Sequence, residues 1–133
     1  QSLLDTMWDD VGVLRDRAGL DRGLLKLADI ETELLATGIP ESTGAFNMTW
    51  HDWLNLRSLV EISQVIATAA LARENSRGAH FREDFPDRGP LATSTYTVAR
   101  RQSGHLAITH APVAFTRVKP GDTLIPDASA AAQ

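Results

Sequence analysis

The chain has 133 residues, of which 43% are hydrophobic and 23% are charged, and its formal net charge at pH 7 is −4. This composition is typical of one ordinary globular domain, and the acidic balance argues against nucleic acid as a partner. The absence of cysteine excludes a thiolate metal site and a cysteine nucleophile and argues against a disulfide scaffold. The longest uncharged apolar stretch, residues 65–72, is far shorter than the roughly 20 residues that span a bilayer, so no direct membrane insertion is expected.

The first part of the chain predicts two amphipathic helices. Apolar residues recur at helical spacing from Leu3 to Leu14, and again from Leu20 to Leu34. Gly19 is a natural end for the first helix, and Gly38 ends the second shortly before a proline. Because the link between them is short, the two helices are expected to lie antiparallel. The chain begins without a methionine, which suggests a segment of something longer.

A third and longer helix is predicted after the loop at residues 40–47, opened by Thr49 with Asp52 three positions later. Its apolar stripe includes Leu56, Leu59, Ile62 and Ile66, and it is expected to be buried on more than one side. Residues 1–88 are therefore predicted to form an antiparallel, spectrin-repeat-like three-helix bundle, the main part of a mainly α fold. Leu14 and Ile62 are predicted to belong to its core.

β-Branched and aromatic residues dominate the sequence after the third helix. They predict a small β-hairpin extension over residues 89–126, with two or three short strands. These strands are placed at residues 93–99, 104–109 and 113–118, with a turn at residues 100–104. Residues 127–133 are expected to be a disordered tail, and the whole chain is treated as a single domain.

Familiar catalytic and cofactor motifs are missing from the sequence. No two of the nine glycines are separated by a single residue, which excludes the Gly-x-Gly turn of dinucleotide-binding folds. Neither lysine follows a glycine as in a P-loop, and no serine has the surroundings of a nucleophile elbow. The four histidines include no pair spaced i, i+4 for a metal. No catalytic, cofactor-binding or metal-binding residue is predicted.

One dense polar segment, residues 73–88, follows the third helix. Gly78 can adopt a positive φ there, which leaves Arg77, His80 and Arg82 free to bind helix carbonyls or a partner's carboxylate. Composition alone favours a solvated, ion-paired helix end. A third interpretation, an acid–base pair of His80 with Asp84 in a small enzyme, is disfavoured because Gly78 and a following proline interrupt any helix.

The same segment carries a family resemblance. Residues 72–86, Ala-Arg-Glu-Asn-Ser-Arg-Gly-Ala-His-Phe-Arg-Glu-Asp-Phe-Pro, resemble a segment near the end of succinate dehydrogenase and fumarate reductase flavoprotein subunits, which reads Ala-Arg-x-Glu-Ser-Arg-Gly-Ala-His-x-Arg-x-Asp-x-Pro. L-Aspartate oxidase has a looser version. The resemblance extends upstream to Met7-Trp8 and to residues 11–15, and downstream through the strands. Asn75 departs from it, because the family commonly has Glu at this position.

The resemblance implies the C-terminal helical domain of an FAD-dependent oxidoreductase, whose flavin and dicarboxylate chemistry belong to preceding domains. This chain alone is then expected to be inactive and to bind no FAD. Its implied partners are the flavin-binding and capping domains and an iron–sulfur subunit, in a cytoplasmic protein held peripherally at the inner face of the membrane. The residues expected to dock it are Ser76, Arg77, His80, Arg82 and Asp84, with Arg77 and His80 exposed. The alternative is a free-standing helical interaction module.

Overall fold

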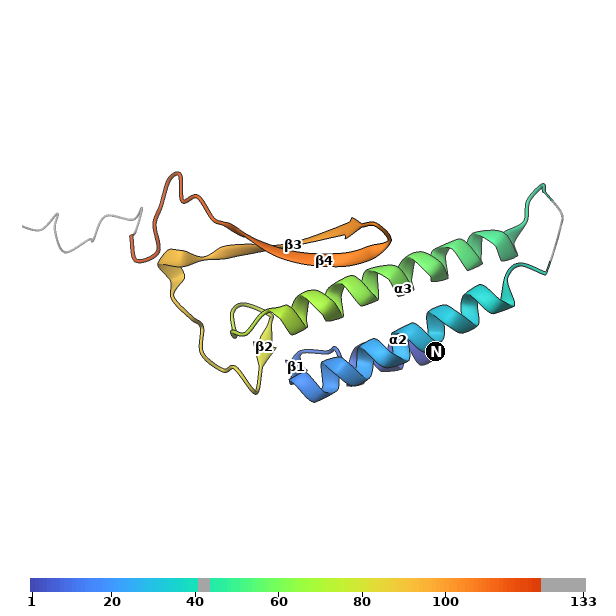
Figure 1. Ribbon diagram of the computed structural model, residues 1–133, viewed down its shortest axis with the longest axis horizontal. Helices are drawn as coiled ribbons and strands as arrows, with labels where there is room; N and C mark the ends of the chain where they lie inside the picture. Colours follow the sequence, from blue (N-terminus) through green and yellow to red (C-terminus); the bar gives the residue numbers. More distant parts are fainter. Residues whose placement is uncertain (41–43, 123–133) are drawn as a thin grey trace, which may run out of the picture.

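The computed structural model describes residues 1–40 and 44–122 (Figure 1). Two long helices, α2 (Arg17–Thr37) and α3 (Met48–Ala72), run side by side as a helical hairpin, and the short α1 (Ser2–Asp9) packs against α2. A β-hairpin lies along α3 on the side away from α2. None of the described helices is long and apolar enough to cross a membrane.

The helix α2 forms as the sequence predicts. The side chain of Asp16 caps its first turn by accepting a hydrogen bond from the Gly19 amide at 2.6 Å, and Gly38 ends it with a φ of 58°. Leu20 and Leu27 are fully buried on its apolar stripe. Gly23 allows the chain before the helix to approach closely, because a Cβ atom there would lie 3.0 Å from a methyl group of Val11.

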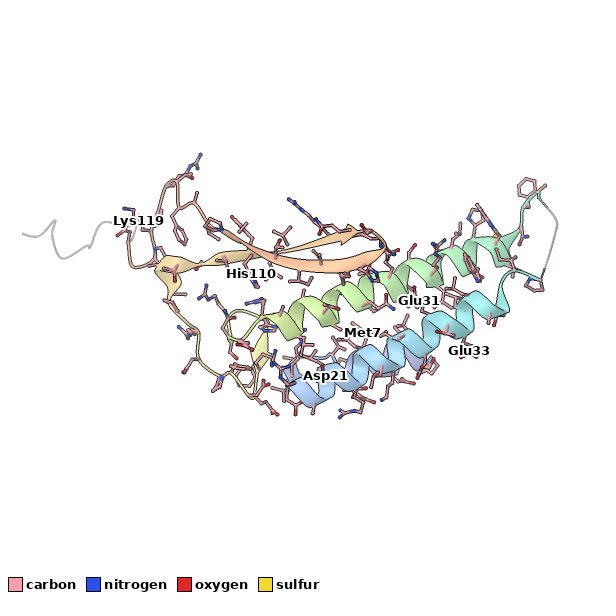
Figure 2. The ribbon with its side chains drawn as sticks, in the orientation of Figure 1. Met7, Asp21, Glu31, Glu33, His110 and Lys119 are labelled. Carbon is pink, nitrogen blue, oxygen red and sulfur yellow. The ribbon has the colours of Figure 1, made fainter. Side chains whose placement is uncertain are left out.

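The helix α3 begins after Asn47, whose side chain accepts a hydrogen bond from the Trp50 amide at 2.9 Å. Two polar contacts join it to α2. The indole of Trp53 donates to the carbonyl of Leu34 at 3.1 Å. Gln64 donates at 2.8 Å to the carboxylate of Glu31, which is labelled on α2 in Figure 2. These contacts set the register of the helical hairpin at two levels along its length.

The prediction of a three-helix bundle is wrong. Its first helix, predicted from Leu3 to an end at Gly19, ends at Asp9, and an eight-residue helix is too short to accompany α2 along its 21 residues. The reason lies at Asp10, which is buried between Arg22 of α2 at 2.6 Å and Lys26 at 2.7 Å. These ion pairs turn the chain away from the helical path.

A strand takes the place of the end of the predicted first helix. Leu14–Arg15 (β1) pairs in parallel with Phe81–Arg82 (β2), so a two-residue sheet joins the start of the chain to the segment after α3. Leu14, predicted to be a core residue, is 65% exposed. The next residue of the strand, Arg15, instead turns its guanidinium toward the interior, where Nε donates to the carbonyls of Val11 and Gly12.

The predicted core stripe of α3 is also wrong. Leu56, Leu59, Ile62 and Ile66 are between 38% and 55% exposed. The buried face consists instead of Val60, Ser63, Ala67 and Ala70. Small side chains on this buried face let α2 and α3 approach closely. The larger side chains of Leu59, Ile62 and Ile66 lie on a neighbouring face, which no described element buries. We call Leu59, Ile62 and Ile66 the apolar face of α3, since Leu56 is in line at helical spacing with the buried Val60 and Ser63.

The predicted hairpin is confirmed, with strands Thr95–Gln102 (β3) and His105–Pro112 (β4) paired antiparallel. The turn predicted over residues 100–104 is shorter than expected, because β3 continues to Gln102. Ser103 and Gly104, with φ values of 50° and 83°, form the tight turn between them. A third strand at residues 113–118 is not formed. Arg101 ties the hairpin to α3 through Glu61 at 2.7 Å. The predicted tail at residues 127–133 lies outside the described residues.

These burial differences lead to a test of the core. We expect Leu27→Ala to lower the free energy of unfolding by about 2–5 kcal/mol, because it removes a fully buried side chain. The matched variant Ile62→Ala should change it by no more than about 0.5 kcal/mol, because this side chain is already largely in solvent. Urea denaturation of both variants measures this, and equal losses would contradict the assignment of the two faces.

Candidate functional site

Residues 73–88 fold back on the end of α3 as a compact loop, which we call the cap loop. The Ser76 hydroxyl donates to the Phe85 carbonyl at 2.8 Å and accepts from the Arg82 amide at 2.8 Å. Arg77 and His80 form a short bridge across Gly78, whose φ of 62° allows the turn that the sequence predicts. The segment is therefore an ordered cap and not a solvated run of charges.

Arg82 is the central side chain of the cap loop, and it is completely buried. Its Nη1 atom donates to the last carbonyls of α3, those of Ala70 at 3.0 Å and Leu71 at 3.1 Å, and to that of Arg73 at 3.2 Å. The Ala70 carbonyl also accepts from the amide of Arg73 at 3.3 Å, the other two lie beyond the last helical amide, and the negative end of the helix dipole favours a cation there. Arg82 thus performs the carbonyl-capping role that its place in the sequence suggests.

Asp84 neutralises Arg82 through a bidentate ion pair, with both N–O distances at 2.7 Å. The hydrogen bond from Arg82 lowers the pKa of Asp84 to about 2, so the carboxylate stays ionised. Asp84 also accepts a hydrogen bond at 3.1 Å from the amide of Arg17, the first residue of α2. One ion pair therefore joins the C-terminal end of α3 to the N-terminal end of α2.

His80 is only 6% exposed, so the expectation of an exposed histidine is wrong. Its Nδ1 atom lies 2.7 Å from Nη1 of Arg15, and since arginine can only donate, Nδ1 must accept. Burial, followed by the positive charge of Arg73, lowers the pKa of His80, and the Arg73 carbonyl offsets this only in part. The ring is thus neutral near pH 7, with its hydrogen on Nε2.

Arg77 is half-buried and holds the segment that follows the cap loop. Its Nη1 atom donates to the hydroxyl of Ser94 at 2.7 Å, and Nη2 donates to the carbonyl of Arg88 at 2.8 Å. The five residues predicted for docking thus lie together around the end of α3. Ser76, His80 and Arg82 are buried in this chain, and only Arg77 and Asp84 keep substantial exposure.

Two cavities flank Arg77. The larger, about 550 Å³, has polar side chains from Arg77, His80 and Arg88 and apolar ones from Phe81, Pro86 and Leu91. The smaller, about 110 Å³, lies toward the β-hairpin and is lined by Arg73, Asn75 and His110, the last labelled in Figure 2. The sequence-based prediction missed Arg15 and Arg73 as parts of this site. A single charged residue directly after the apolar stripe at residues 11–14 is the signal that could have indicated Arg15.

The cap loop does not have the geometry of an acid–base pair. His80 is bonded to Arg15, whereas Asp84 is bonded to Arg82 and Arg17, so the two candidate groups face different partners. Over residues 1–40 and 44–122, no group of three His, Asp or Glu residues could hold a metal ion. The side chains brought together here are suited to binding and to holding a shape.

The junction from β1 to α2 does not fit the pyrophosphate of FAD. The place where a strand runs into a helix, β1 to α2, is where a dinucleotide-binding fold would cradle the pyrophosphate. Here the carboxylate of Asp16 occupies the helix N-terminus and takes the Gly19 amide. Its negative charge opposes a phosphate at that position.

Comparisons with known proteins agree with this geometry. A family model described as the fumarate reductase flavoprotein C-term matches residues 1–125. The chain is 30% identical over 118 residues to the fumarate reductase flavoprotein subunit of Mycobacterium tuberculosis, covering 88% of this chain and 20% of that protein. It is 39% identical over 89 residues to L-aspartate oxidase 1 of Ralstonia nicotianae, covering 67% and 16%. With the succinate dehydrogenase flavoprotein of Coxiella burnetii it shares 32% over 107 residues, covering 80% and 18%.

Solved structures show the same fold. Quinol fumarate reductase of E. coli matches with a TM-score of 0.79 at 24% identity, over 88% of this chain and 20% of that one. Sdh1 of Mycobacterium smegmatis matches with a TM-score of 0.66 at 30% identity, over 82% and 18%. The chain belongs to the fumarate reductase flavoprotein C-terminal family, as the resemblance of the cap loop predicts. It spans only 16–20% of the length of the curated relatives named above.

The burial of Arg82 leads to a stability test. We expect Arg82→Met to lower the free energy of unfolding by about 3 kcal/mol or more, because the end carbonyls of α3 and the Asp84 carboxylate lose their partner together. Arg100→Met, at an exposed position of β3, is the matched control and should stay within about 0.5 kcal/mol. Urea denaturation decides between the two, and similar values for both variants would rule out the capping role.

His80 leads to a pH test. Because its pKa in the folded chain is lowered from 6.5, the unfolded chain binds the proton more readily, and the free energy of unfolding should fall as the pH drops below about 6.5. One proton limits this slope to about 1.4 kcal/mol per pH unit. In His80→Gln, whose amide oxygen can still accept from Arg15, the slope between pH 5 and 7 should be smaller. An unchanged slope in denaturation curves would show that His80 protonates as easily in the folded state.

Proposed function

We propose that this chain is the helical C-terminal domain of an FAD-dependent oxidoreductase of the succinate dehydrogenase/fumarate reductase type. In that protein it supports and docks against the flavin-binding part, and it is not catalytic alone. The observation that carries this proposal is the apolar face of α3, which no described element of the chain buries. A domain that spans about a fifth of its relatives and leaves such a face uncovered is suited to a larger protein.

Exposed apolar side chains are not confined to α3. On α1, Leu4 is 67% exposed and Trp8 is 80% exposed, one helical turn apart on the same side of the helix. Tryptophan is enriched where protein surfaces meet, because it buries a large area with little loss of conformational freedom. These two residues support a second contact of the domain with the rest of the protein.

The cap loop is proposed to take part in this docking. Ser76, Arg82 and Asp84 give the loop its shape, since their hydrogen bonds are made within the chain. Arg77 and His80 then line the cavity beside it. This division of roles follows from burial, because only a side chain that reaches a cavity or the surface can touch a partner.

The proposal includes a cofactor and partners. FAD is assigned to the preceding part of the parent protein and not to this chain, in agreement with Asp16 at the strand-to-helix junction. The partners are the flavin-binding and capping domains and an iron–sulfur subunit. The proposed location is the cytoplasm, peripheral at the inner face of the membrane through partner subunits. Its support is that relatives are named as flavoprotein subunits and as quinol fumarate reductase.

Separate production of this chain and of the flavin-binding part of its parent tests the docking. We expect the two polypeptides to associate, and the double variant Leu59→Ser, Ile62→Ser to weaken the association at least tenfold. The physical reason is that burying one such side chain contributes about 1.5–3 kcal/mol. Isothermal titration calorimetry measures the affinity.

Leu35→Ser, at a 55% exposed position of α2, is the matched control and should leave the affinity unchanged. Thermal melting of each variant confirms that the chain remains folded. Equal affinities for the wild-type chain and the double variant would contradict the assignment of the apolar face of α3 as the docking surface.

A further inference from the structure

Positive charge accumulates at the end of α3 beyond what the chain neutralises. Arg15, Arg73 and Arg77 take part in none of the ion pairs found over residues 1–40 and 44–122. They lie close enough together that the charge of Arg73 lowers the pKa of Arg15, and that of Arg77 lowers the pKa of Arg73, in each case after burial as the larger cause. Such an arrangement favours a nearby negative charge.

Two carboxylates near this cluster already have partners, and the exposed Glu83 and Asp87 of the cap loop form no ion pair with its arginines. Asp84 is held by Arg82 at 2.7 Å, and Glu74 lies 3.5 Å from Arg17. Arg73 donates only to a neutral acceptor here, the amide oxygen of Asn75 at 3.1 Å. Among the described residues, the three arginines therefore find neutral hydrogen-bond acceptors, but no carboxylate forms an ion pair with any of them.

Two hydrogen-bond donors at the same place have no acceptor within the described part of the chain. They are Nε2 of His80 and Nε of Arg77, both buried. The Arg73 carbonyl is near enough to the His80 ring to affect its pKa, but it does not meet hydrogen-bond geometry. His80 Nε2 must carry the hydrogen because Nδ1 accepts from Arg15, and an arginine Nε is always a donor. A buried donor without a partner is unfavourable, so both atoms call for an acceptor from outside the chain.

The larger cavity beside the cap loop brings these features together. His80 and Arg77 both line its volume of about 550 Å³, which is ample for a side chain, and Arg88 adds another cation. Its other walls include Phe81 and Leu91, which are 38% and 44% exposed. Cationic donors within an apolar rim suit a carboxylate carried on a polypeptide, because the rim contacts the segment while the donors bind its charged end.

We infer that this cavity binds the carboxylate of an aspartate or glutamate from the flavin-binding part of the parent protein. The inference rests on the proposed function, since it names the chemistry of one docking contact. We assign the carboxylate to the rest of the parent protein because about four-fifths of a relative such as the M. tuberculosis protein lies outside the matched segment. The carboxylate completes the hydrogen bonds of His80 and Arg77, and its charge also offsets, at longer range, that of Arg15 and Arg73, which do not line this cavity.

Acetate is a probe of this chemistry in the 133-residue chain. Nitrogen-15 NMR of labelled histidines should show a saturable shift of the His80 Nε2–H signal and a higher pKa of His80 with acetate bound. N-Methylacetamide, of similar shape but uncharged, should cause no saturable shift. Absence of an acetate shift, or an equal response to both compounds, would overturn the proposal.

Variants sharpen this test. Arg77→Gln should weaken acetate binding at least threefold, whereas Arg117→Gln, an exposed arginine outside the cavity lining, should not. Asn75→Glu should also weaken it, because a carboxylate from the chain itself then meets Arg73, and Asn75→Gln is its uncharged control. Thermal melting identifies any variant that no longer folds. Unchanged acetate affinity in folded Arg77→Gln and Asn75→Glu would overturn the inference.

Association with the separately produced flavin-binding part distinguishes this inference from the proposed function. Asn75→Glu should weaken the association relative to Asn75→Gln. If only the apolar-face variant weakens it, docking stands and the carboxylate contact is wrong. If acetate binds but the two polypeptides do not associate, the proposed function fails, and with it the named source of the carboxylate.

Discussion

The ion pair between Arg82 and Asp84 is the interaction on which the rest of this structure depends. Its cation lies at the carbonyl end of α3 and its anion at the amide end of α2, so each charge meets the helix end that stabilises it. Arg82 is also the last residue of β2, which pairs with β1. A single partly buried ion pair thus connects both long helices with the start of the chain, and the cap loop derives its shape from it.

Packing between α2 and α3 explains why the domain has an apolar surface. The buried face of α3 is built from small side chains, among them Ala67 and Ala70, and close helix contact there leaves little room for larger groups. Leu59 and Ile62 then lie on a face that neither α2 nor the β-hairpin buries. In an independent monomer such a face would lower solubility, whereas in a part of a longer chain it is suited to contact with another domain.

Local sequence patterns predicted the parts of the fold that depend on neighbouring residues, such as helix stripes and turns. The stripe of α2, the tight turn at Gly104 and the positive φ of Gly78 were all readable from the sequence. The first helix was predicted too long because its periodicity continues past Asp10, and only contact with Arg22 and Lys26 of another helix turns the chain there. Two apolar faces on α3 made the core face ambiguous by periodicity alone.

At the candidate site too, contacts between residues distant in the sequence could not be predicted from local patterns. The motif predicted that Ser76, Arg77, His80, Arg82 and Asp84 act together, and the structure places all five around one helix end. The burial of His80 was not predictable, because its partner Arg15 approaches from 65 residues away through the β1–β2 pair. A docking role for the five residues remains a prediction.

The parallel pairing of β1 with β2 has a consequence for the order of folding. It closes a chain loop that contains both α2 and α3, and a contact between such distant residues forms at a high cost in chain entropy. The helical hairpin relies on nearer contacts and is expected to assemble first, with the cap loop closing over it last. Arg15, Arg73 and Arg77 would then come together only in the fully folded domain. A partner that binds them would therefore bind the folded chain and not a partly folded one.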